Sequence, residues 1–200
     1  MGLLQPFGHA CQLFDSVDTR AEAVASFLAE GIRAGDYVIA VPRPAHWTAV
    51  AARLEARGLS VEELTAQGRL AVYDAAATLA RFCPRGRINP FTFNELVGAT
   101  VEPAAGRRVR AWGEMVDLFA ERGDFDGALE LEELWNRVGE LMPLTLMCTY
   151  TAAHFAAPAS HGAVRSLCAL HTAVHRNPND RLGDWILTMA HHSGGSSLTH

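Results

Sequence analysis

A glycine-rich phosphate loop is missing from the place where a nucleotide-binding α/β domain would carry one. An apolar run at 10–14 is followed by a short turn and then by an amphipathic segment. The turn, Asp15-Ser16-Val17-Asp18-Thr19, contains no glycine and no lysine, and its two carboxylates would repel a phosphate group. The sequence therefore predicts a scaffold of the nucleotide-hydrolase type that lacks the hydrolase groups, which favours sensing or regulation over catalysis.

Cysteine, positive charge and long apolar runs are also scarce. There are four cysteines, Cys11, Cys83, Cys148 and Cys168. They form no C-x-x-C pair and are too widely spaced for a secreted disulfide framework, so we expect reduced thiols. The formal net charge of −5 gives no electrostatic reason to bind DNA or RNA. Because no apolar run has the length of a membrane span and no signal peptide is recognisable, we predict a cytoplasmic protein.

Apolar runs of strand length alternate along the chain with amphipathic segments of helical period. The runs begin near Ala10, Tyr37, Leu70, Arg108 and Leu144. Helices are predicted over about 19–34, 45–57, 60–68 and 125–142, after Asn89-Pro90, near 115–119, and in a last helix with Val164, Leu167, Cys168 and His171. Nearly continuous apolar runs are typical of strands buried on both faces. We therefore predict one three-layer α/β domain, in which helices cover both faces of a mostly parallel central sheet.

Several short strings follow one another in a particular order. They are His9-x-Cys11, Gly31-Ile32-x-x-Gly35-Asp36-Tyr37-Val38, Arg110-x-Trp112-Gly113-Glu114-Met115 and Leu146-Met147-Cys148-Thr149-Tyr150, followed by His171. Together they resemble the MEDS family, the methanogen/methylotroph DcmR sensory domain, over about residues 8–175. Residues 176–200 would then be a C-terminal extension, the end of which we expect to be disordered.

The resemblance implies a RecA-like fold, related to KaiC-type ATPases, in which the phosphate-binding loop has degenerated. It also implies that the domain senses a small molecule, such as a hydrocarbon derivative, and acts in signalling or transcription regulation without a cofactor. Many relatives are fused to a histidine kinase or to a DNA-binding domain. Neither is present in this sequence, so the expected partner is a separate histidine kinase or transcription regulator.

Eight residues are candidates for contacts with that ligand: His9, Cys11, Arg110, Glu114, Glu132, Cys148, Tyr150 and His171. Ligands of parallel sheets bind beyond the carboxyl ends of the strands. Arg110 and Glu114 bracket one such end, while Cys148 and Tyr150 share one face near another. We therefore predict that these four residues approach a common pocket, with His9 and Cys11 close to it. Glu132, on a helix, is placed so that it could face Arg110.

Each candidate also has a structural interpretation. Cys11 could pack as a small apolar residue, Cys148 could be a buried inert thiol, and Arg110 and Glu114 could bond only to each other. His171 and His175 have the i, i+4 spacing of a helical metal site. No acidic residue lies between them as in the H-E-x-x-H pattern, and we expect neither a metal nor a catalytic residue.

Two other classes of function stay open. The chain could be a pure protein-interaction regulator that binds no small ligand. It could also be a thiol- or metal-dependent enzyme that uses Cys148 or Cys11 with His171, although no nucleophile elbow or Cys-His signature supports this alternative.

Overall fold

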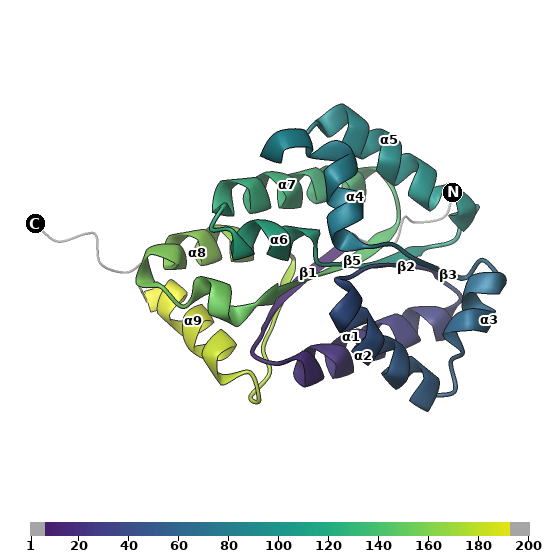
Figure 1. The fold of residues 1–200 in the computed structure, drawn as a ribbon, viewed down its shortest axis with the longest axis horizontal. Helices are drawn as coiled ribbons and strands as arrows, with labels where there is room; N and C mark the ends of the chain where they lie inside the picture. Colours follow the sequence, from purple (N-terminus) through teal and green to yellow (C-terminus); the bar gives the residue numbers. More distant parts are fainter. Residues whose placement is uncertain (1–6, 193–200) are drawn as a thin grey trace, which may run out of the picture.

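Parallel strands form the middle layer of this computed structural model, which describes residues 7–192 (Figure 1). The strands of the described residues are β1 (Gly8–Phe14), β2 (Tyr37–Val41), β3 (Leu70–Val72), β4 (Val109–Gly113), β5 (Leu144–Thr151) and β6 (Ala173–His175). They form one six-stranded sheet in the order β3-β2-β4-β5-β1-β6, and each neighbouring pair is parallel. The five predicted strands are therefore neighbours in one layer, as expected.

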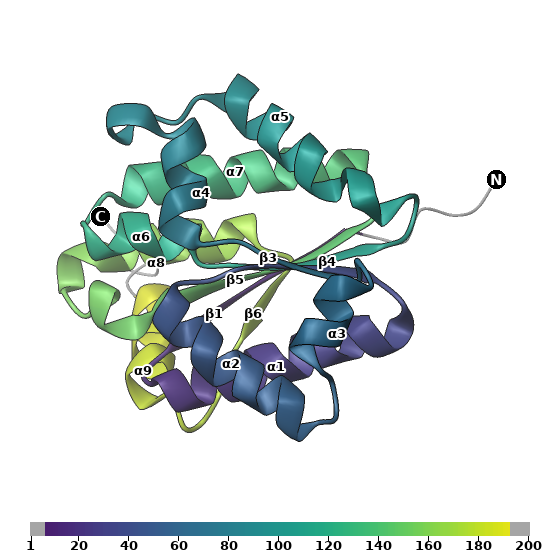
Figure 2. The same ribbon diagram turned by 45° about the vertical axis from the view of Figure 1, so that its right-hand side comes forward.

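Helices cover both faces of the sheet (Figure 2). One face carries α1 (Val17–Ala34), α2 (Pro44–Ala56) and α3 (Val61–Ala66); the other carries α4 (Ala75–Phe82), α5 (Pro90–Val101), α6 (Met115–Glu121), α7 (Phe125–Leu141) and α8 (His161–Leu170). The last helix, α9 (Arg181–His192), packs against α8 and β1. The predicted three-layer α/β fold with a parallel central sheet is confirmed. None of the described helices is long and apolar enough to cross a membrane.

Alternation along the strands divides the buried side chains between two cores. On β5, Leu146 and Cys148 pack with the α4–α8 layer, whereas Met147 packs with the α1–α3 layer. On β4, Ala111 packs with the α4–α8 layer and Trp112 packs with the α1–α3 layer. Because successive strand residues face opposite sides, this alternation decides which candidate residues can meet.

Helix α4, strand β6 and helix α9 were not predicted, and one predicted helix was too long. No element was predicted over 75–90, but Asp74 accepts a hydrogen bond from the Ala77 nitrogen and so caps α4. Helix α8 ends at Leu170, and His171 has an extended backbone that leads into β6. The predicted arrangement of His171 and His175 on one helix face is therefore wrong.

Residues beyond 175 contribute to the core rather than forming only a polar tail. Ile186, Leu187 and Ala190 of α9 are buried. Gly183 lies so close to β1 that an added Cβ would come within 2.9 Å of the Leu13 carbonyl oxygen. The end of the chain that we expected to be disordered, 193–200, lies outside the described residues.

Candidate functional site

Arg110 lies on the opposite face of the sheet from Cys148. Its guanidinium lies 4.8 Å from the centre of the Phe27 ring of α1, and its Nε donates to Asp36 Oδ2 at 3.1 Å. Gly31 leaves the space for this side chain, because a Cβ there would fall 2.3 Å from Arg110 Cδ. The predicted pocket that Arg110 shares with Cys148 is therefore wrong, and the reason is the two-residue period of β4.

Glu114 is also separated from the other candidates. It follows β4 and is fully buried, and its carboxylate accepts from Arg20 Nη1 at 3.0 Å and from the Arg43 backbone nitrogen at 2.9 Å. His46 Nδ1 lies 2.8 Å from the same carboxylate. The structural alternative, in which Arg110 and Glu114 bond only to each other, is also wrong, because Arg110 bonds to Asp36 whereas Glu114 bonds to Arg20 and to the Arg43 backbone nitrogen.

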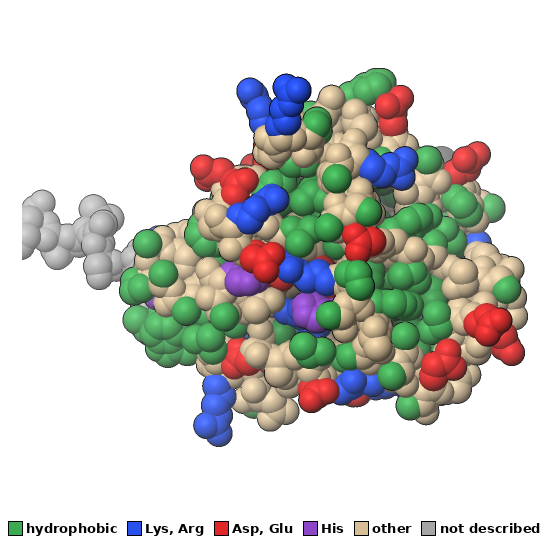
Figure 3. Space-filling model, viewed as in Figure 1, with side chains coloured by type: hydrophobic (Ala, Val, Ile, Leu, Met, Phe, Trp, Pro, Cys, Tyr) green, Lys and Arg blue, Asp and Glu red, His purple; other side chains and the backbone are tan. Residues whose placement is uncertain are grey.

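The carboxyl edge of the sheet is filled by ion pairs. Asp117 is buried and lies 2.9 Å from His154 Nδ1, 2.8 Å from the Thr151 nitrogen and 3.2 Å from Arg43. Burial favours the neutral form of Asp117, but the contacts with His154 and Thr151 and the charge of Arg20 prevail and lower the pKa of its carboxyl. Figure 3 shows basic, acidic and histidine side chains gathered at the centre of this face.

An internal carboxylate, that of Asp180, holds the turn between β1 and α1. Asp180 is buried, and its Oδ1 accepts from the Asp15 backbone nitrogen at 2.9 Å and from the Thr19 hydroxyl at 2.5 Å. Asp15 in turn accepts from the backbone nitrogens of Leu182 and Gly183 at the start of α9. Donors at this turn are therefore satisfied from within the chain.

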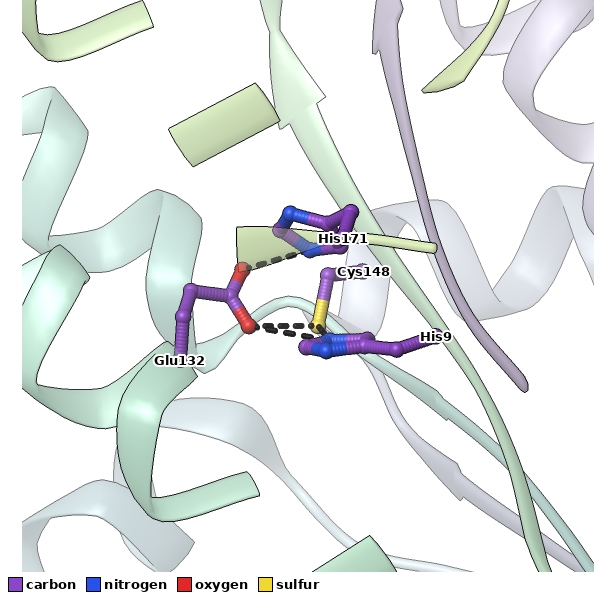
Figure 4. Close-up of side chains that lie close together, drawn as sticks. All are labelled: His9, Glu132, Cys148 and His171. Atoms are coloured by element: carbon purple, nitrogen blue, oxygen red, sulfur yellow. Dashed lines mark hydrogen bonds and ion pairs between the residues drawn. The ribbon is translucent and has the colours of Figure 1, made fainter. Parts of the chain in front are cut away.

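Four other candidates meet between the sheet and α7. We call His9, Glu132, Cys148 and His171 the buried cluster (Figure 4). They come from β1, α7, β5 and the residue after α8. Glu132 Oε2 lies 3.1 Å from His9 Nε2 and 3.2 Å from Cys148 Sγ, and Glu132 Oε1 lies 3.3 Å from His171 Nε2. Glu132 is thus buried and does not face Arg110, although the sequence left that possibility open.

Tyr150 and Cys11 lie beside the buried cluster. The Tyr150 hydroxyl donates to Glu132 Oε1, and both side chains are fully buried. Cys11 is buried next to Cys168 of α8, and the hydrogen bond with Cys168 together with burial raises the pKa of the Cys11 thiol. The structure therefore brings together five of the eight candidates, places Cys11 next to them, and separates Arg110 and Glu114.

Burial and charge act together on the titratable groups of the buried cluster. Burial favours neutral Glu132, but the charge of His171 and the close contacts with His171 and His9 prevail, so that the pKa of this carboxyl is well below its ordinary value. Burial lowers the pKa of His171, but the charge of Glu132 outweighs it and raises the pKa. Burial and the charge of Glu132 raise the pKa values of Cys148 and Tyr150. Cys148 is therefore a poor nucleophile in this state.

An apolar cavity of about 50 Å³ lies between the sheet and the layer of α4, α5 and α7. Ile39 and Ala111 are on its floor, and Phe93, Val97 and Trp135 are among the helix residues that line it. Leu146 also lines it and precedes Cys148 by two residues on the same face of β5. The cavity is thus a neighbour of the buried cluster but has apolar walls.

Four residues that complete these sites were not among the predicted candidates. They are Arg20, Asp117, Asn136 and Asp180. Two of them carried a signal. Arg20 precedes Val24 and Leu28 at four-residue intervals and thus lies on the buried face of α1, and Asn136 lies one helical turn after Glu132. A polar residue on the apolar face of a helix indicates a buried partner.

The fold and these sites define a parallel α/β domain in which an internal carboxylate, that of Asp180, bonds to the turn between β1 and α1. The MEDS family model, MEthanogen/methylotroph, DcmR Sensory domain, matches residues 8–172, and the chain belongs to this family. The predicted family is therefore confirmed, and membership supports a sensory or regulatory role.

Curated proteins and solved structures give less information about this chain than the family model does. No curated protein was found to match the chain. Among solved structures, a KaiC-like protein from the hyperthermophilic archaeon Pyrococcus horikoshii OT3 is similar, with a TM-score of 0.47 and 15% sequence identity. The match covers 72% of this chain and 62% of that protein. This likeness supports no statement about activity.

Proposed function

We propose that this domain is a sensor that binds a small, largely apolar molecule in the cavity under α4, α5 and α7, and that it signals through a partner protein. The observation that carries this proposal is the cavity itself, which is about 50 Å³ in volume and lined mainly by apolar side chains. One water molecule requires roughly 10–15 Å³, and apolar cavities of this kind stay dry and bind apolar molecules. A hydrocarbon derivative with a few heavy atoms, as the family resemblance implies, suits such a space.

The helices above the cavity provide a route for the signal. Phe93 of α5 contacts the ring of Phe82 in α4 at 5.2 Å and the ring of Trp135 in α7 at 5.0 Å between ring centres. A molecule in the cavity would add contacts beneath these rings and favour one position of α5. A ligand that binds one position of α5 more tightly than another shifts the population toward that position, which is how a sensor responds.

The partner would then read the outer side of this helical layer. Phe91 of α5 and Leu141 of α7 are apolar side chains that are exposed to 71% and 86%. A histidine kinase or transcription regulator, as the resemblance implies, is the class of partner we propose. Cytoplasmic localisation is part of the same proposal.

We further propose that the domain is not catalytic and needs no organic cofactor. Cys148 is fully buried with a raised pKa, which disfavours thiol chemistry. Asp180 satisfies donors of the turn between β1 and α1, which disfavours a bound nucleotide phosphate. These contacts support a degenerate phosphate loop.

Binding of small apolar probes tests the sensor proposal. Benzene and dichloromethane should raise the melting temperature of the full chain, and Ala111→Leu, which places carbon atoms in the cavity, should abolish this rise. Phe91→Ala is the matched control, because Phe91 is apolar but exposed, and it should respond like the unmodified chain.

Xenon binding followed by nuclear magnetic resonance gives a second readout that does not depend on unfolding. If neither probes nor xenon bind, or if Ala111→Leu binds them unchanged, the sensor proposal is wrong. The first of these results would favour a pure protein-interaction regulator.

A further inference from the structure

We propose that His9, Glu132, Cys148 and His171 form a closed, four-coordinate site for a divalent metal ion of the zinc class. Each residue offers one ligand atom, and these atoms all lie within 4.8 Å of one another. The site goes beyond the proposed sensing of an apolar molecule, because none of its residues lines the apolar cavity. The sequence spacing suggested a pair of His171 with His175, whereas the structure pairs His171 with His9, with 4.1 Å between the ring centres.

The distances between the ligand atoms suit a tetrahedral ion. Zinc binds nitrogen, oxygen and sulfur at about 2.0–2.3 Å, so neighbouring ligand atoms around it are roughly 3.3–3.8 Å apart. Here His9 Nε2 lies 3.1 Å from Glu132 Oε2 and 3.4 Å from Cys148 Sγ. Cys148 Sγ lies 3.2 Å from Glu132 Oε2, and His171 Nε2 lies 3.3 Å from Glu132 Oε1. Small side-chain movements would therefore open a tetrahedral site.

Hydrogen bonds on the outer side orient both imidazoles for metal binding. Asn136 Nδ2 donates to the Leu170 carbonyl at 2.9 Å, which turns Asn136 Oδ1 toward His9 Nδ1 at 2.8 Å. His171 Nδ1 lies 2.7 Å from the Leu167 carbonyl. Both of these oxygens are acceptors, so each Nδ1 donates a proton to one of them, and in the neutral form of each ring the Nε2 lone pair faces inward. Metal-binding histidines ordinarily have such partners on the other ring nitrogen.

The inner side of the cluster then holds more acceptors than donors. Two Nε2 atoms face the Glu132 carboxylate, and the donors there are the Cys148 thiol and the Tyr150 hydroxyl. The His171 side chain is fully buried, and its Nε2 has no hydrogen-bond partner among the described residues. Buried acceptors that face a carboxylate need positive charge or hydrogen-bond donors between them. Protonation of each imidazole would supply a donor at that ring, whereas one metal ion would bind all four side chains at once.

The donor set indicates which ion fits. Two imidazoles, one thiolate and one carboxylate match the ligands that zinc takes, and the thiolate disfavours magnesium and calcium. Coordination breaks the Cys148 S–H bond and releases that proton to solvent. The charges of the thiolate and of Glu132 then balance the divalent ion, so the buried site is neutral. The Tyr150 hydroxyl bond to Glu132 is retained as an outer contact.

The site would link distant segments of the chain. The four ligands tie β1, β5, α7 and the segment between α8 and β6 together beneath the helical layer. All four positions are supplied by the protein, as in structural zinc sites rather than catalytic ones. Loss of the ion would release α7 and α8 from the sheet at one point.

Metal analysis and cobalt substitution of the full chain test the proposal. The chain purified under reducing conditions, or loaded with Zn²⁺, should retain about one ion per molecule after gel filtration, because closed four-ligand sites bind tightly. The cobalt form should show the near-ultraviolet band of a cobalt–thiolate bond and the visible bands of a tetrahedral ion. Cys148→Ser should lose the thiolate band, while Cys83→Ser, another buried free cysteine outside the cluster, should retain it.

A second variant, at a residue that positions His9, keeps the test decisive if Cys148→Ser does not fold. Asn136→Leu removes the partner of His9 Nδ1 and should weaken metal affinity by roughly 10–100-fold while the thiolate band persists. The proposal is overturned if the unmodified chain retains no metal and gives no cobalt–thiolate band. It is equally overturned if that band persists in Cys148→Ser or disappears in Cys83→Ser.

Discussion

Asp180 Oδ1 lies 2.9 Å from the backbone nitrogen of Asp15 and thus holds the turn between β1 and α1 with an internal carboxylate. The same oxygen accepts from the Thr19 hydroxyl. In a nucleotide-binding relative of this fold, donors at this turn would face a phosphate. Here the negative group is part of the chain, and it comes from the segment that leads into α9.

We expect no ATP hydrolysis and no tight binding of Mg-ATP by the full chain. The turn has no glycine cradle and no lysine, and Asp180 would repel the phosphates. Isothermal titration with Mg-ATP is the measurement, and a dissociation constant in the low micromolar range would contradict the expectation.

Replacement of Asp180 should destabilise the fold. Asp180→Ala leaves the Asp15 nitrogen and the Thr19 hydroxyl without their partner, which should lower the free energy of unfolding by about 1–3 kcal/mol. Asp184→Ala is the control, because Asp184 pairs with Arg176 at the surface and its loss should change stability by less than about 1 kcal/mol. Urea denaturation measures both, and equal effects would refute the buried role.

Arg110→Leu should lower stability without changing ligand or metal binding. Asp36, which is 3% exposed, would lose its bond to Arg110 but keep that to Arg108, so we expect a loss of about 1–3 kcal/mol. Arg108→Leu, at a more exposed side chain, should have the smaller effect. Urea denaturation and the probe-binding assay are the measurements. Loss of probe binding in a folded Arg110→Leu protein would contradict the expectation and show that Arg110 takes part in ligand binding.

Asp117 should make the fold sensitive to acid. Its pKa is lower in the folded chain than in the unfolded chain, where an aspartate titrates near 3.9, so its stabilisation is complete above that value. The stabilisation is lost as the pH falls through the lower folded pKa, because the unfolded chain then binds the proton first. The difference in unfolding free energy between the unmodified chain and Asp117→Asn should therefore be constant above about pH 5 and shrink as the pH falls from about 5 to about 2. A difference that stays constant over this range would refute the assignment.

Two buried alanines on neighbouring strands should respond differently to enlargement. Ala111 on β4 faces the cavity, as does its register partner Ile39 on β2. Ala40, the next residue on β2, faces the opposite core between the sheet and α1–α3. Ala111→Leu should therefore change stability by less than about 1 kcal/mol, and Ala40→Leu should destabilise by about 1–3 kcal/mol through overpacking. Urea denaturation compares them, and an equal loss in both would show that the cavity does not accept additional atoms.

The order of the elements was readable from the sequence because its causes are local. Apolar runs such as 37–41 mark strands buried on both faces, and the turn at 15–19 contains no glycine and no lysine. The order and spacing of the short strings from His9 to His171 indicated the family, which the match over 8–172 confirms. These features depend on neighbouring residues and not on the path of the chain.

The composition of the sites was decided only by the tertiary structure. Arg110 and Cys148 were both placed correctly on strands, but a period of two residues turned them to opposite faces, and only the register of β4 against β5 shows this. Glu132 meets His9 and His171 because β1, α7 and the end of α8 converge in space. Contacts between segments this far apart in sequence depend on how the helices pack on the sheet, and no local pattern encodes that packing.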